Sequence, residues 1–352
     1  MKAAIFRLHR YIGLLAAAFL FVQALTGTML VFGPQVAQLL DPAGMVSSEG
    51  STDASLARLV AAAAARYPGA GFGRIVYPSQ NDGTYLVCLV LADGAERFVS
   101  VDRHSAGVLR QGGVWRFPVI AALNLHDQWL SGRFGTAIVS LAGLCLIFLA
   151  GTGLFYWWPQ RGALRKSLSV RWQVSPRLVL RQLHRTAGVS LSALLAFMAV
   201  TGMFVAVPMM LDPPTPTYAT AAEVASGIDS AAILARKAFP GRTIRDIRQP
   251  ARDGLAVFLF APERNSMAVS RVVVDTVAGK VESTRAASAD RASWVIALPL
   301  HSGRTFGLPG RILIMLAGLC LAALAVTGPL MWLQARRTRR RSRASLPTRS
   351  FA

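Results

Sequence analysis

Four long apolar stretches dominate the pattern of hydrophobic and polar positions along the chain. They cover residues 13–32, 134–157, 187–207 and 312–332, are 20 to 24 residues long and carry almost no charge. A helix rises about 1.5 Å per residue, so each stretch is long enough to cross a hydrocarbon core of roughly 30 Å. No small-residue cleavage site follows the first stretch before Gln35, which favours a retained span over a signal peptide. The pattern predicts a mainly α membrane protein with four transmembrane helices.

The two long connections between paired spans have a mixed pattern. The first predicts an Ala-rich helix over 54–65 and strands over 74–77, 84–90 and 97–101, with a turn at Asn81-Asp82-Gly83. The second predicts a helix near 230–239 and strands over 255–260 and 269–274. The strand ends Val101-Asp102 and Val274-Asp275 are each followed by a glycine turn, at Gly107 and Gly279. These inserts are typical of small α+β domains, one in each half of the chain.

Composition and charge placement support the membrane interpretation. Hydrophobic residues make up 53% of the chain, more than in typical soluble proteins, and charged residues make up 16%, which is fewer. The net charge of +21 raises the question of nucleic acid, but residues 1–10, 161–185 and 336–349 carry 3, 7 and 7 Lys or Arg and no acid. All 17 acids lie in the other two connections. Because basic short loops stay on the cytoplasmic side, both termini are predicted inside and the inserts outside, and no nucleic-acid partner is expected.

The chain repeats itself at one fixed offset of 175 residues. Two copies of one hairpin in the same orientation, related by an axis along the membrane normal, are typical of parallel-repeat membrane folds. The matches include Leu8-His9-Arg10 with Leu183-His184-Arg185, Gly13 with Gly188, Thr26-Gly27 with Thr201-Gly202, Leu125-His126 with Leu300-His301, Gly135 with Gly310, residues 141–145 with 316–320, Thr152-Gly153 with Thr327-Gly328, Trp157 with Trp332, and Arg161 with Arg336.

This repeat predicts a tandem duplication with eight segments. They are a first span with a cytoplasmic N-terminus (1–33), a first insert (34–125), a second span (126–160), a basic cytoplasmic loop (161–183), a third span (184–208), a second insert (209–300), a fourth span (301–335) and a basic cytoplasmic tail (336–352).

Four of the five histidines obey the repeat, and His104 does not. His9 and His184 begin spans one and three at the predicted cytoplasmic face, whereas His126 and His301 precede spans two and four at the outer face. Helices related by a pseudo-twofold axis present equivalent residues at the same depth, so each pair can meet across a bundle. Two facing imidazoles fit the two axial positions of a haem iron.

Other interpretations of these histidines stay open at this point. A single interfacial histidine is commonly a polar anchor or a structural hydrogen bonder. Zinc or copper would usually need further protein ligands, which the sequence does not offer in repeated positions. No Cys-x-x-Cys-His is present, so any haem is expected to be b-type, and the three cysteines indicate no disulfide framework.

Neighbouring residues follow the same symmetry. Arg10 and Arg185, directly after the cytoplasmic-side histidines, and Arg161 and Arg336 at the same face could pair with haem propionates or serve as positive-inside anchors. Thr152-Gly153 and Thr327-Gly328 reach the depth of the cytoplasmic histidines, where a missing side chain would let a flat macrocycle approach the backbone or let helices pack closely. The sequence nominates no catalytic residue.

These residues and motifs make the chain similar to the PepSY-associated transmembrane family over nearly its whole length. The resemblance rests on Leu8-His9-Arg10 with Thr26-Gly27, Leu125-His126 with Thr152-Gly153, and their second copies. It implies a four-helix membrane part that binds two haems through His9, His126, His184 and His301, with PepSY-like domains facing the periplasm. The family includes iron-regulated membrane proteins and bacterial ferrisiderophore reductases, although a family alone does not prove an activity.

The resulting hypothesis is a bis-histidine, two-haem electron-transfer protein of the bacterial inner membrane. It would reduce a ferric siderophore or other ferric chelate in the periplasm, because reduction weakens the hold of hard oxygen ligands on iron. With no flavin or nicotinamide motif, a quinol or a separate flavoprotein must supply the electron. Two alternatives remain: a haem-free PepSY-type sensor or peptidase regulator, and the haem-bearing membrane subunit of another oxidoreductase.

Overall fold

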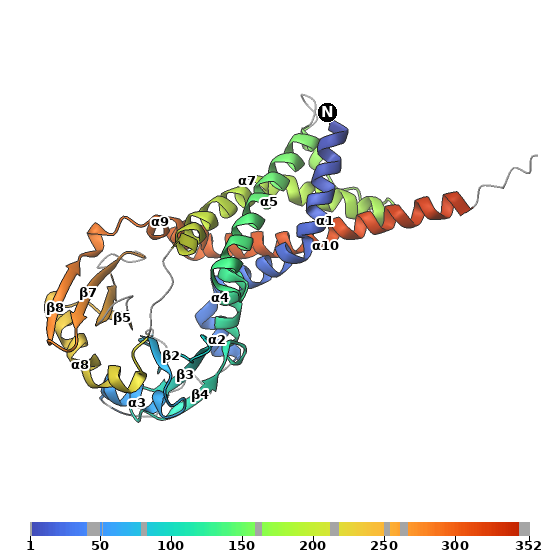
Figure 1. Cartoon of the computed structure of the whole chain (residues 1–352). Helices are drawn as coiled ribbons and strands as arrows, with labels where there is room; N and C mark the ends of the chain where they lie inside the picture. Colours follow the sequence, from blue (N-terminus) through green and yellow to red (C-terminus); the bar gives the residue numbers. More distant parts are fainter. Residues whose placement is uncertain are drawn as a thin grey trace, which may run out of the picture. The chain divides into compact units, whose positions relative to one another are not determined.

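The computed structural model describes residues 2–40, 50, 52–78, 83–158, 164–211, 218–249, 254–260 and 267–344, the last seven by their backbone alone. The chain divides into two compact units. Residues 1–31, 125–210 and 300–352 form the helical unit, and residues 32–124 and 211–299 form the sheet unit. Figure 1 shows the helices of the first unit and the curved sheet of the second. The predicted Asn81-Asp82 turn and Arg161 lie outside the described residues.

Four helices of the helical unit are long and apolar enough to cross a membrane, which confirms the four predicted spans. They are α1 (Lys2–Val31), α5 (Gly132–Trp157), α7 (Pro176–Leu211) and α10 (Gly307–Ala344), with the short α6 (Leu164–Leu168) before α7. Each helix begins before its apolar stretch, because the preceding residues, polar ones among them, are also helical. Pro176 suits the first position of α7, where the amide hydrogen that proline lacks would have no helical partner.

Residues 175 positions apart make matching contacts inside the helical unit. Gly13 of α1 faces Leu149 of α5 at 3.6 Å from an ideal Cβ, and Gly188 of α7 faces Leu324 of α10 at 3.7 Å. Gly143 of α5 lies against Ala199 and Met203 of α7, and Gly318 of α10 lies against Ala24 and Thr28 of α1. Small residues therefore let the helices approach closely both within each half and between the halves.

A short helix precedes each of the spans α5 and α10. These are α4 (Pro118–Gln128) and α9 (Ser293–His301), the second followed by the 3₁₀ helix η3 (Arg304–Phe306). The sequence predicts one continuous span from residue 126, but left-handed backbone at Trp129, Leu130 and Gly132 breaks the helix there. A Cβ at Gly135 would lie 1.6 Å from the Gln128 carbonyl oxygen, and one at Gly310 would lie 2.3 Å from that of Gly303. The two glycines thus let each short helix fold back against the start of its span.

The sheet unit contains one eight-stranded antiparallel sheet in the order β4-β3-β2-β1-β5-β6-β7-β8. The strands are β1 (Gly71–Val76), β2 (Thr84–Val90), β3 (Glu96–Asp102), β4 (Val108–Gly112), β5 (Ile244–Arg248), β6 (Leu255–Phe260), β7 (Val269–Asp275) and β8 (Lys280–Arg285). The remaining elements are α2 (Gly33–Leu40), α3 (Leu56–Ala64), η1 (Val114–Arg116), α8 (Ala221–Ala238) and η2 (Ala287–Ala289).

The two inserts meet at the centre of this sheet and share one core. β1 pairs with β5 so that Ile75 lies opposite Ile247, and both side chains are fully buried. Helices α3 and α8 pack on the same core through residues such as Leu59 and Ile228. Irregularities in strand register fall at corresponding places in the two four-stranded halves, between Phe72 and Arg74 and again between Ile244 and Asp246.

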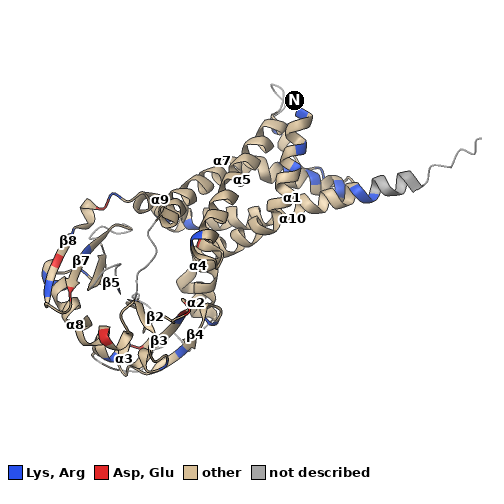
Figure 2. Cartoon of the chain, viewed as in Figure 1, with Lys and Arg blue, Asp and Glu red and all other residues tan. Residues whose placement is uncertain are grey.

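Acidic and basic residues are distributed differently over the two units, as Figure 2 shows. Basic residues mark the start of α1 and the last described side chains of α10, whereas the acids of the described chain lie in the inserts and at Asp127 of α4. Contacts of His9 with Thr152 and of His184 with Thr327 bring the starts of α1 and α7 beside the ends of α5 and α10. The described parts of the basic segments therefore adjoin one end of the helical unit.

Candidate functional site

His9 and His184 are each held by a threonine of the neighbouring span. The His9 Nδ1 lies 2.9 Å from the Thr152 Oγ1, and the His184 Nδ1 lies 2.7 Å from the Thr327 Oγ1. Each threonine hydroxyl already donates its single hydrogen to a carbonyl of its own helix, Phe148 or Leu324. The hydroxyl oxygen must then accept from the imidazole. Nδ1 therefore carries the proton, and the Nε2 lone pair is available to a ligand.

His126 and His301 repeat this arrangement at the other end of the helical unit. The His126 Nδ1 lies 3.2 Å from the Thr26 Oγ1 and 3.1 Å from the Gln23 carbonyl oxygen. The His301 Nδ1 lies 3.3 Å from the Thr201 Oγ1 and 2.9 Å from the Met198 carbonyl oxygen. A carbonyl can only accept, so these two histidines also have the proton on Nδ1. No described residue forms a hydrogen bond with Nε2 of any of the four.

The glycine after each threonine provides room for the imidazole. An ideal Cβ would lie 2.7 Å from the His126 Cε1 at Gly27 and 3.0 Å from the His301 Cε1 at Gly202. At Gly153 and Gly328 the corresponding distances, to His9 and His184, are 3.4 and 3.6 Å. From the sequence, Gly153 and Gly328 were expected to let a macrocycle approach the backbone or to let helices pack closely. In the structure they face the histidine ring itself, so each Thr-Gly pair both accepts from and accommodates one imidazole.

The four histidines form two pairs. The rings of His126 and His301 lie 6.1 Å apart between centroids at an interplanar angle of 48°. His9 lies close enough to His184 to interact with it electrostatically. His9 and Thr26 occupy the same helix 17 residues apart, which separates the two levels by roughly 25 Å along the helix axis. The structure therefore brings together all four histidines selected from the sequence, as one pair at each end of the helical unit.

Three buried donors without a hydrogen-bond partner belong to the His9 and His184 end. They are the Nε atoms of Arg10 and Arg185 and the indole Nε1 of Trp157. Other nitrogens of the two arginines are engaged, with the Tyr11 hydroxyl at 3.2 Å and the Ser169 carbonyl oxygen at 3.3 Å. A buried donor without an acceptor is unfavourable, so these atoms indicate an anionic or carbonyl-bearing partner at this end. The sequence pointed to the two arginines, whereas Trp157 was identified only as a repeated position matched by Trp332.

The chemistry of the donor set limits which metal group could bind. No group of three or more His, Cys, Asp or Glu gathers in the described part of the chain. Two neutral imidazoles offer two ligands to each metal, which fits a metal whose other positions are filled by a macrocycle better than a bare zinc or copper ion. The donors present therefore fit a haem at each level.

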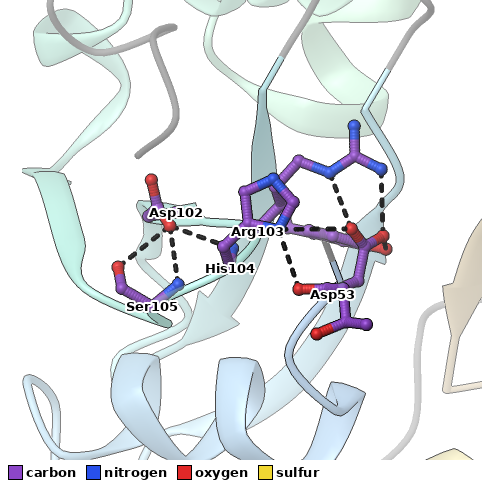
Figure 3. A network of polar contacts seen from close by, with 7 residues as sticks. Asp53, Asp102, Arg103, His104 and Ser105 are labelled. Carbon is purple, nitrogen blue, oxygen red and sulfur yellow. Dashed lines mark hydrogen bonds and ion pairs between the residues drawn. The ribbon is translucent and has the colours of Figure 1, made fainter. Parts of the chain in front are cut away.

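His104 lies in the sheet unit, in the turn after β3, and makes only structural contacts in the described region (Figure 3). Its Nδ1 donates to the Thr52 carbonyl oxygen at 2.8 Å. Arg103 donates to both carboxylate oxygens of Asp53, at 2.8 and 3.1 Å, and this hydrogen bonding lowers the pKa of Asp53. The Asp102 carboxylate accepts from the backbone amides of His104 and Ser105. The network ties the segment around residue 52 to the end of β3.

Comparison with known proteins bears on the whole chain. Residues 6–335 match the family described as the PepSY-associated TM region. No curated protein matches the sequence. The matched range covers nearly all of the four spans, together with both inserts and the two histidine pairs, so the chain belongs to the PepSY-associated TM region family.

Proposed function

We propose that this protein is a tandemly duplicated, two-haem electron-transfer protein of the bacterial inner membrane that reduces ferric chelates, such as ferrisiderophores, in the periplasm. The observation that carries the proposal is the shared setting of the four histidines. Each imidazole has its Nδ1 proton fixed by a threonine or carbonyl oxygen, each sits over a glycine, and each keeps Nε2 available. Such orientation by a second hydrogen bond is usual for metal-binding histidines.

The distance between the outer rings supports this assignment. Two imidazoles that bind one iron from opposite sides through bonds of about 2 Å have ring centroids about 6 Å apart. The value for His126 and His301 is 6.1 Å. At the other level, the unpartnered nitrogens of Arg10 and Arg185 are suited to the propionates of a b-type haem held by His9 and His184.

The duplication and the membrane orientation are part of the same proposal. Matching contacts at an offset of 175 residues support descent of the two halves from one hairpin. The described parts of the basic segments adjoin one end of the helical unit, which supports a cytoplasmic location for both termini, and the two inserts are then PepSY-like domains in the periplasm.

Each part of the chain has a defined task in this function. Bound haem supplies an iron that carries one electron at a time. His9 with His184 and His126 with His301 would hold the two haems, and the bound haems would supply one-electron transfer to the ferric chelate. The apolar spans exclude water from the path between the levels. The electron donor is a quinol or a separate flavoprotein.

The test is the haem-to-protein ratio of the purified full chain and of its histidine variants. We expect two haems per chain, with the loss of one in His9→Ala or His184→Ala and of the other in His126→Ala or His301→Ala. His104→Ala is the matched control and should keep both. Reduced protein should then be reoxidised by a ferric siderophore. An unchanged ratio in all four variants would reject the ligands, and colourless protein after haem supplementation would favour the haem-free sensor.

A further inference from the structure

Three arginines gather around one phenylalanine in the second half of the sheet. They are Arg245 and Arg248 of β5 and Arg271 of β7, and their guanidinium carbons lie 5.0 to 5.8 Å from the centre of the Phe258 ring on β6. Val257, next to Phe258, points into the core that α3 and α8 cover. Because successive side chains of a strand alternate between its faces, Phe258 lies on the face turned away from these helices. Attraction between cations and the ring helps to hold the three like charges together.

The protein supplies this cluster with less negative than positive charge. Asp246, buried on the same face of β5, pairs with Arg245 at 2.6 Å and also with Arg248. No acid of the described chain pairs with Arg271, so three positive charges face one negative charge. Repulsion between like charges grows where burial limits solvent screening, which makes this place favourable for a further anion.

Arg271 is the member of the cluster with unused hydrogen-bonding capacity. It is only partly exposed, and its Nε is buried without a hydrogen-bond partner. Its other guanidinium nitrogens also form no hydrogen bond or ion pair with the residues that the structure describes. Largely buried arginines are normally paired and buried donors normally hydrogen-bonded, which points to an acceptor from outside the chain. The Arg248 side chain beside the same ring keeps 42% of its surface exposed, so a dissolved anion can reach the cluster.

The first half of the sheet shows that the fold does not require this cluster. Strand pairing and the matching register irregularities align Cys88 with Phe258 and Phe98 with Arg271. Cys88 and Phe98 are buried, and Phe98 contacts the Phe117 ring at 5.8 Å between centroids. The corresponding place in the first half is therefore apolar and closed by its own chain, whereas the second half presents cations there.

We propose that the cluster of Arg245, Arg248 and Arg271 recognises a ferric chelate with a net negative charge. This inference names the substrate class of the proposed reduction and rests on that proposed function. Carboxylate and catecholate oxygens are good acceptors for guanidinium groups. A ferric ion held by three catecholates is trianionic and its citrate complexes are also anionic, whereas its complex with three hydroxamates is neutral. The excess positive charge therefore favours catecholate and citrate chelates over hydroxamate chelates.

The experiment measures binding of gallium chelates to the full chain in a neutral detergent at low ionic strength. Gallium(III) has the charge of ferric iron but is not reduced by haem, so binding is separated from electron transfer. Calorimetric titration compares the tris-catecholate and citrate complexes with a tris-hydroxamate complex. We expect one saturable site for at least one anionic complex, an affinity that falls as salt rises, and binding of the neutral complex that is weaker by about tenfold or more.

Arg271→Gln should weaken binding of the anionic complex about tenfold or more, because it removes charged donors without leaving Asp246 unpaired. Arg58→Gln is the matched control, since Arg58 is an exposed arginine of α3 away from the cluster and should leave binding unchanged. If Arg271→Gln lowers the melting temperature, Arg271→Lys keeps the charge and should still weaken binding by removing the planar donor geometry.

Equal affinity for neutral and anionic complexes, or no saturable binding of any complex, would overturn the proposal, as would equal weakening in Arg271→Gln and Arg58→Gln. Retained phosphatidylglycerol that is lost in Arg271→Gln, without chelate binding, would assign the cluster to a lipid headgroup and also overturn it. A chain with two haems that fails these titrations refutes chelate recognition alone. A colourless chain that passes them refutes the electron-transfer function and leaves chelate recognition standing.

Discussion

At the level of single residues, the threonines that face the histidines decide which imidazole nitrogen is free. Thr152 and Thr327 are the hydroxyl partners of His9 and His184, whereas His126 and His301 also face a backbone carbonyl. The sequence placed Thr152-Gly153 at the depth of His9 but could not assign the contact, because the two residues lie 143 positions apart. Hydrogen bonding across such a separation depends on helix rotation, which an almost uniformly apolar span does not encode.

Replacing Thr152 with valine should weaken haem retention about tenfold at the His9 level, since the imidazole loses its oriented acceptor. Thr26→Val should have a smaller effect because His126 retains the Gln23 carbonyl. Haem content after dialysis against apomyoglobin measures both. Thr136→Val is the control, as this hydroxyl donates to the Gly132 carbonyl in its own helix. A larger loss in Thr26→Val than in Thr152→Val would contradict the hydrogen-bond assignment.

Replacing the glycines that accommodate the imidazoles should have effects that increase as the distance between the added Cβ and the ring decreases. Gly27→Ala should displace His126 and lower the haem-to-protein ratio from two towards one, because its Cβ would lie 2.7 Å from the ring. Gly328→Ala should keep both haems, since 3.6 Å is an ordinary contact. The measurement is the absorbance of extracted haem per protein. Similar losses in both variants would show that the glycines serve helix packing instead.

At the level of elements, the joint between α4 and α5 sets the position of His126. The backbone reverses through Trp129, Leu130 and Gly132, and the Gln128 carbonyl then rests on Gly135. Gly310 plays the same part for His301, where the contact is with Gly303. Both histidines are therefore held by short helices that fold against the spans.

Gly135→Ala should disrupt this joint, because no rearrangement of side chains can relieve a Cβ placed 1.6 Å from a backbone oxygen. We expect a lower melting temperature and loss of the outer haem, while the His9 and His184 level keeps its spectrum. Gly151→Ala in the same span meets no atom within 4 Å and serves as the control. If Gly135→Ala retains both haems, the joint between α4 and α5 is not needed to position His126 for haem binding.

The apolar pattern predicted some elements well and others poorly, for identifiable reasons. The predicted strands 84–90 and 255–260 coincide with β2 and β6, which consist largely of buried apolar residues. Strands β4, β5 and β8 were missed because arginines and other polar residues interrupt them, and every residue of β8 is exposed. Their strand conformation comes from pairing with a neighbour and not from their own composition.

At the level of the whole molecule, the union of both inserts in one sheet was not predictable from either insert alone. A period of two residues identifies the buried face of a strand but not its partner. The central pair, β1 and β5, also contains the buried Asp246, which lies opposite Val76. Burial would raise the pKa of Asp246, but Arg248 and Arg245 outweigh it and hold the pKa below its usual value.

This lowered pKa predicts acid sensitivity of the sheet. The stabilisation is complete above the unfolded-state pKa of about 4 and is lost as the pH falls through the lower folded-state value. The melting temperature should therefore drop as the pH falls from 5 to 3. At pH 7, Asp246→Asn should lower the free energy of unfolding by about 3 kcal/mol and lower the melting temperature accordingly. The melting temperature of this variant should also depend less on pH in the acid range.

Scanning calorimetry of the full chain in detergent measures these effects, with Asp93→Asn as the control because Asp93 lies in an exposed turn. If the melting temperatures of Asp246→Asn and of the unchanged protein fall in parallel below pH 5, other groups govern the acid transition.

The pairing of β1 with β5 has a consequence for synthesis on the ribosome. About 170 residues separate Ile75 from Ile247, so at 5 to 20 residues per second β1 emerges roughly 10 to 35 s before its partner exists. Throughout that interval the nascent first insert exposes a bare hydrogen-bonding edge while translation continues through two further spans. Unpaired edges invite association between chains. The half-made protein thus depends on protection of this edge until the second insert arrives to close it.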